Sequence, residues 1–207
     1  MTQRKKSRFG GWVLLAISSA FTISFDWILS PMLAQIVSYE TFGEILKLAT
    51  PFSAILCLFG YTLIAIQEEK QAKIPAIALA ILNLAAAINS LVYHSLSFYF
   101  VISAAMIVML FWLVFAVTKQ LHVGVRVVGL IACGFSAIST VADAIYDILI
   151  DRSMLESGTY TGTTALVLLF QRIPFAISAI AMLVACITIA IAKFEQSKAQ
   201  KGEIVHV

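Results

Sequence analysis

The chain has 207 residues, of which 61% are hydrophobic and only 12% are charged, and its mean hydropathy is +0.97. Soluble domains average about 45–50% apolar and about 25% charged residues, so this composition excludes an ordinary water-soluble fold. The formal net charge of +3 requires no nucleic-acid partner, because basic residues also mark one side of a bilayer. We therefore expect one integral membrane domain, residues 1–207, with lipid as its main surroundings.

Six apolar segments are long enough, at about 20 residues each, to cross a bilayer as helices. In chain order they are expected at about 10–30, 51–67, 74–93, 97–118, 126–150 and 163–192. The first resembles a secretory signal, but its apolar run continues through Trp27, so we expect an uncleaved anchor. The sequence thus predicts an all-α bundle of six transmembrane helices, followed by a flexible cytoplasmic tail over 194–207.

The basic residues in the connections predict the orientation. With the N-terminus inside, eleven of them lie on the cytoplasmic side: Arg4, Lys5, Lys6, Arg8, Lys70, Lys73, Lys119, Arg126, Lys193, Lys198 and Lys201. Only Lys47 and Arg152 lie in the opposite connections. Cytoplasmic loops carry an excess of Lys and Arg, so we expect both termini in the cytoplasm and the chain in a plasma or inner cell membrane.

Residues 31–50 form a long connection between the first and second spans. Glu40, Glu44 and Lys47 share one helical face, and the other positions are largely apolar. This pattern predicts a short amphipathic helix on the outer surface of the membrane. It either covers the mouth of the bundle or lies in the headgroup layer.

The segment 126–150 carries the clearest polar face. Small or polar residues recur along it at spacings of three and four: Gly129, Cys133, Ser136, Thr140, Asp143 and Asp147. Such spacing places them on one side of a helix. Because a charge in hydrocarbon costs about 2.5–3.5 kcal/mol, we expect this side to face protein or water. Spans one, three and six show weaker polar faces, whereas spans two and four show almost none, so we expect the latter two to face lipid.

Charged and amide side chains recur at one depth. Counted at 1.5 Å per residue from the inner basic residue of each span, they lie about 24–32 Å from the inner boundary. The predicted solute-binding residues are this layer and its neighbours: Asp26, Asn89, His94, Thr140, Asp143, Asp147, Gln171 and Arg172. Three interpretations remain open: a structural salt bridge between Arg172 and an aspartate, a solute site facing outward, or an intramembrane enzyme using paired carboxylates.

No HExxH, GxSxG or glycine-rich phosphate motif supports the enzyme, which is the least favoured of the three. The three histidines fall in a turn, a loop and a tail: His94, His122 and His206. The three cysteines lie inside apolar segments without a CxxC pair: Cys57, Cys133 and Cys186. We therefore expect free thiols, no disulfide, no metal and no cofactor.

The favoured function is binding or transport of a small polar solute or ion at an outward-facing site. The alternative is a non-catalytic structural or accessory membrane subunit. Such a subunit would bind a membrane protein partner or a second copy of this chain.

Overall fold

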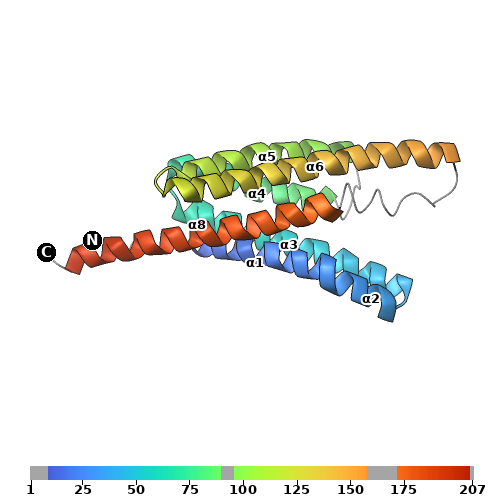
Figure 1. Cartoon of the computed structure of the whole chain (residues 1–207), viewed down its shortest axis with the longest axis horizontal. Helices are drawn as coiled ribbons and strands as arrows, with labels where there is room; N and C mark the ends of the chain where they lie inside the picture. The colour runs from blue at the N-terminus through green and yellow to red at the C-terminus, as the bar shows by residue number, and fades with distance from the viewer. Residues whose placement is uncertain (1–8, 90–95, 158–171, 206–207) are drawn as a thin grey trace.

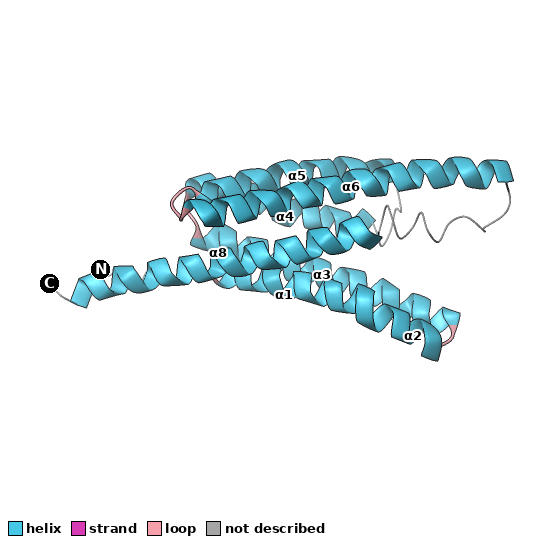
Figure 2. Ribbon diagram, viewed as in Figure 1, coloured by secondary structure: helices cyan, strands magenta, loops and turns pink. Residues whose placement is uncertain are grey.

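The computed structural model describes residues 9–89, 96–157 and 172–205, which are helical apart from short turns. The elements in chain order are α1 (Gly10–Ser24), the π-helix η1 (Phe25–Leu29), α2 (Ser30–Ile36), α3 (Tyr39–Gln67), α4 (Lys70–Ile88), α5 (Leu96–Thr118), α6 (Val123–Ser157) and α8 (Ile173–Val205). Figures 1 and 2 show the long helices side by side, without a strand in the described residues. For these residues the all-α prediction is confirmed.

Large apolar side chains cover the outside of the bundle. On α4 the exposed ones recur every three or four residues and form one stripe: Ile74, Ile77, Ile81, Leu84 and Ile88. The buried face of the same helix consists mainly of small residues: Ala72, Pro75, Ala76, Leu79, Ala80 and Asn83. A soluble protein rarely leaves such an apolar stripe in water, whereas lipid solvates it. The surface is therefore that of a membrane protein.

Five described stretches are long and apolar enough to cross a membrane: Gly10–Leu29, Lys70–Ile88, Phe98–Thr118, Val123–Ile145 and Ile173–Ala199. The remaining expected span, 51–67, corresponds to a shorter apolar stretch of α3, Phe52–Gln67. The fold is thus a bundle of the membrane type, with five candidate spans and one shorter apolar helix.

Two segments differ from their expected form. Residues 39–50 are not a separate surface helix, because α3 runs from Tyr39 to Gln67 without a break. This helix starts at Ser38, whose hydroxyl accepts a hydrogen bond from the Thr41 backbone N–H (3.4 Å) and so caps the first turn. The segment after Lys193, expected as a flexible tail, is helical as far as Val205.

The long helices form a closed ring. Each packs against the next along the chain, from α1 through α3, α4, α5 and α6 to α8, and α8 packs back against α1. The expectation that spans two and four lie outside a four-helix centre is therefore wrong, because α3 and α5 have the same two-neighbour packing as the others. The scarcity of polar residues on a helix does not determine its place in the ring.

Two glycines set the closest approaches between neighbouring helices. A Cβ on Gly11 of α1 would lie 2.6 Å from the Gly60 carbonyl oxygen of α3, and a Cβ on Gly129 of α6 would lie 2.6 Å from a Val114 methyl of α5. A residue without a side chain lets the helices come this near: backbone meets backbone at Gly11, and backbone meets a Val114 methyl group at Gly129. Glycine therefore fixes the α1–α3 crossing and the α5–α6 crossing.

Candidate functional site

A cavity of about 510 Å³ lies inside the ring. Its wall is formed by side chains from all six long helices, together with Phe25 of η1. Binding pockets for small molecules have volumes of about 300–1,000 Å³ and combine an apolar wall with a few polar groups. The cavity has this size and this kind of wall.

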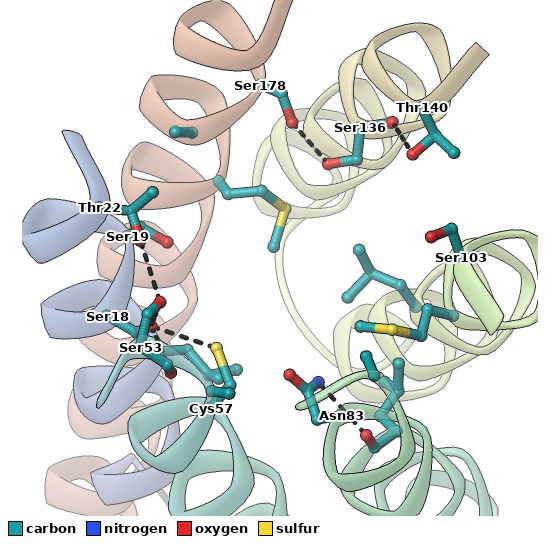
Figure 3. A pocket seen from close by; sticks show the side chains of 18 of the residues that line it. Ser18, Ser19, Thr22, Ser53, Cys57, Asn83, Ser103, Ser136, Thr140 and Ser178 are labelled. Carbon is teal, nitrogen blue, oxygen red and sulfur yellow. Dashed lines mark hydrogen bonds between the residues drawn. The ribbon is translucent and has the colours of Figure 1, made fainter. Parts of the chain in front are cut away.

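The polar groups of the wall are neutral. They belong to hydroxyl, thiol and amide side chains, of which Figure 3 labels ten: Ser18, Ser19, Thr22, Ser53, Cys57, Asn83, Ser103, Ser136, Thr140 and Ser178. Among the described side chains that line the cavity, none carries a charge. The cavity therefore presents hydrogen-bonding groups in an apolar setting and no fixed charge from these residues.

One cluster of polar groups joins α1 to α3. The Ser18 hydroxyl donates to the Ser53 carbonyl oxygen (3.2 Å) and lies 3.1 Å from the Ser53 hydroxyl and 3.2 Å from the Cys57 sulfur. The Thr22 hydroxyl lies 3.0 Å from that of Ser53. We call Ser18, Thr22, Ser53 and Cys57 the α1–α3 cluster. Hydrogen bonds between helices of this kind stabilise membrane bundles modestly and hold polar groups at fixed positions.

A second cluster joins α6 to α8. The Ser136 hydroxyl donates to the Ala132 carbonyl oxygen (3.1 Å) and lies 3.0 Å from the Ser178 hydroxyl. The Thr140 hydroxyl donates to the Ser136 carbonyl oxygen (3.1 Å). Ser136, Thr140 and Ser178 form the α6–α8 cluster, and Figure 3 shows it on a different side of the cavity from the α1–α3 cluster.

A tightly packed core forms the floor of the cavity. Leu15, Tyr61, Leu79 and Leu110 belong both to this core and to the cavity wall. On the other side of them, toward the α3–α4 turn, lie fully buried residues such as Trp12, Ile64 and Leu113. The cavity thus occupies the half of the bundle that is remote from the α3–α4 and α5–α6 turns, and the other half is closed by packing.

An ion pair lies at the closed end. Lys193 of α8 and Glu68, the residue that ends α3, have side chains only 4% and 5% exposed. The Lys193 Nζ lies 3.0 Å from each carboxylate oxygen and donates a hydrogen bond to Oε2. An aromatic contact between Phe9 and Phe194, with ring centroids 5.4 Å apart, lies beside it. These contacts join the middle of α8 to the start of α1 and the end of α3.

The predicted charged layer adjoins the cavity. Thr140 lines it directly, and on four helices a predicted residue lies within one turn beyond a residue of the wall. These pairs are Phe25 and Asp26, Ala86 and Asn89, Thr140 and Asp143, and Phe175 and Arg172. Along the backbone, the predicted charged layer therefore lies next to the cavity wall, at the end of the cavity opposite the floor.

The predicted residues differ in their surroundings. Asn89 is buried at 3% exposure, Asp143 is half-buried, and the Arg172 side chain is exposed. Asp26 lies in η1 and Asp147 in α6, where only the backbone is described. His94 and Gln171 lie outside the described residues. Among the predicted residues whose side chains are described, Thr140 is the one that lies in the wall.

The site contains residues that the prediction left out. Five of them belong to the polar faces of the predicted spans but carry no charge: Ser18, Thr22, Asn83, Ser136 and Ser178. The predicted solute-binding residues are the charged layer and its neighbours, so these five are not among them. Ser53, Cys57 and Ser103 lie on α3 and α5, the two helices expected to face lipid. These three residues reach the cavity because α3 and α5 are part of the ring. The helical period of a single segment does not determine which helices form that ring.

No group of three His, Cys, Asp or Glu side chains in the described residues could hold a metal ion. Cys57 lines the cavity, whereas Cys133 and Cys186 are fully buried in the core, and all three thiols are free. Comparison of the chain with protein-family models, with curated proteins and with solved structures gave no match. The cavity is therefore the feature of this protein that bears on its function.

Proposed function

We propose that this membrane protein binds a small uncharged solute in the cavity inside its helical ring. The single observation that supports this function is the wall of the cavity. It combines apolar side chains with ten labelled neutral polar groups, and no charged group occurs among its described residues. An ion would lose its hydration in such a place without gaining a counter-charge from these described residues, whereas a neutral solute needs no counter-charge.

The proposed orientation follows from the basic residues. With both termini in the cytoplasm, the floor of the cavity lies on the cytoplasmic side and the cavity lies in the outer half of the membrane. Transport would then require the floor to open between α1 and α3, where Gly11 meets Gly60, and between α8 and the α3–α4 turn, where Lys193 meets Glu68.

The natural cysteines provide a test that needs no knowledge of the solute. N-ethylmaleimide is small and uncharged, and in membranes containing the folded protein it should alkylate Cys57 much faster than Cys133 or Cys186. Peptide mass spectrometry after brief labelling separates the three sites. Cys133 and Cys186 serve as internal controls, since both are 0% exposed.

Equal and slow alkylation of the three thiols would contradict the proposal. It would mean that a small neutral molecule does not reach the cavity. That result is expected for a purely structural or accessory subunit with a closed interior.

A further inference from the structure

The hydroxyl protons of the α6–α8 cluster are all used within the protein. Each hydroxyl has one proton and can accept two hydrogen bonds. The Ser136 proton goes to Ala132 and the Thr140 proton to the Ser136 carbonyl oxygen. The hydrogen bond between Ser136 and Ser178 must then use the proton of Ser178. This cluster retains lone pairs on Thr140 and Ser178, both in the cavity wall, and no proton to donate.

The α1–α3 cluster gives the same result. The Ser18 proton goes to the Ser53 carbonyl oxygen, so the Ser53 hydroxyl donates to Ser18. Thr22 then donates to Ser53, and the Cys57 thiol donates to Ser18. All four protons are engaged, and Thr22 keeps both of its lone pairs. Both clusters therefore accept hydrogen bonds and do not donate them.

We infer that the ligand of this cavity is a neutral hydrogen-bond donor, a molecule that carries hydroxyl or amide N–H groups on a mainly apolar frame. The inference rests on the proposed function and narrows its solute class. A donor on the ligand satisfies lone pairs of Thr22, Thr140 or Ser178, which would otherwise face an apolar molecule. The two clusters do not require an acceptor on the ligand, but an acceptor would find donors elsewhere in the wall. These are the hydroxyls of Ser19 and Ser103 and the second amide hydrogen of Asn83, whose first is bonded to the Leu79 carbonyl oxygen (3.3 Å).

The wall also argues for the apolar frame. Phe21, Phe25, Leu79, Ile107 and Phe175 contribute large apolar surfaces between the clusters. A strongly hydrated solute would lose more water contacts there than the two clusters replace. A protonated amine would in addition lack a carboxylate partner among the described residues of the wall.

The test compares benzyl alcohol with benzyl methyl ether, which share a frame and differ in one donor. Each is titrated over the same range of concentrations in the membrane, and protection of Cys57 from N-ethylmaleimide is measured at each concentration. One hydrogen bond of ordinary net strength corresponds to a factor of about 2 to 12 in affinity, so the alcohol should protect at several-fold lower concentration. Ser178→Ala should reduce this difference, whereas Thr188→Val should not, because the Thr188 hydroxyl bonds the Val184 carbonyl oxygen outside the cavity wall.

The outcomes separate the two proposals. If Cys57 reacts selectively but the ether protects as well as the alcohol, or neither protects, the donor class is wrong while the accessible cavity stands. If Cys57 is as unreactive as Cys133 and Cys186, the proposed function itself fails and the inference fails with it.

Discussion

The ammonium group of Lys193 lies 3.0 Å from both carboxylate oxygens of Glu68, although 125 residues separate them in the chain. The pair joins the last helix to the turn between α3 and α4, at the end of the bundle below the cavity floor. Replacing both members of a buried ion pair with apolar residues costs a protein far less stability than removing one member, because a single removal leaves an unpaired buried charge. This pair is therefore a sensitive probe of how the ring closes.

Glu68→Gln should lower the free energy of unfolding by about 3–5 kcal/mol, because it leaves the Lys193 charge buried without its partner. The double variant Glu68→Leu/Lys193→Met should recover most of that loss. Lys198→Met is the control, since Lys198 is exposed and only stacks on Phe194 at 4.7 Å. Denaturation of the purified protein in mild detergent measures all three; additive losses in the double variant would contradict the pairing.

Gly11→Ala should destabilise the bundle by about 1–3 kcal/mol, because the added methyl group would lie 2.6 Å from the Gly60 carbonyl oxygen and the Ile64 side chain. Gly134→Ala is the matched control. No atom lies within 4 Å of its added Cβ, so it should be neutral or gain up to about 1 kcal/mol from helix propensity. Thermal unfolding in detergent compares the two, and equal melting temperatures would argue against the close α1–α3 crossing.

Two of the three tryptophans should report the inside and the outside of the ring. Trp12 is 0% exposed, whereas Trp112 is 44% exposed on the outer face of α5. Single-tryptophan variants are reconstituted with phospholipids brominated on their acyl chains, which quench fluorescence on contact. Strong quenching is expected for the variant that retains Trp112 and little for the variant that retains Trp12. The reverse order would mean that the ring is turned inside out.

Ser103→Phe should fill part of the cavity and slow the alkylation of Cys57 by N-ethylmaleimide several-fold. Ser103 and Cys57 both line the wall, on α5 and α3. Val108→Phe provides the control on the same helix, because Val108 is 61% exposed on the outer surface. Equal labelling of Cys57 in the two variants would show that the reagent reaches the thiol by a route other than the cavity.

The helical period in the sequence predicted which way α6 faces. Gly129 and Cys133 are buried, Ser136 and Thr140 line the cavity, and Phe135, Ile138, Val141 and Ile145 are exposed on the opposite side. The period is informative because side chains that face lipid are large and apolar, whereas side chains that face the protein are small or polar. This difference repeats at every turn of the helix. The period therefore determines the direction of each helical face once the chain is known to span a membrane.

The neighbours of each helix could not be derived in this way. Contacts between α1 and α3 depend on a glycine approach that leaves no periodic signal, and the cavity depends on how six helices leave space between them. Charge in the sequence predicted a site at the layer containing Asp26, Asp143 and Arg172, which lies within one turn beyond residues of the wall. The neutral hydroxyls of Ser18 and Ser136 were visible in the sequence, but nothing there showed that they would surround a common space.

The π-helix η1 interrupts the first span at Phe25–Leu29, beside the cavity wall. Pro31 explains its position: the proline has no backbone N–H for the carbonyl of residue 27, so an α-helical hydrogen bond is missing at this point of the helix. A π turn contains one residue more than the α-helical turn it replaces. Removing one residue from 25–29 should therefore restore an ordinary turn and leave the helical faces before and after it pointing in nearly their present directions. The wider turn thus absorbs one residue locally, so the hydroxyl face of Ser18 and Thr22 and the segment α2 keep the relative directions that a continuous helix one residue shorter would give them.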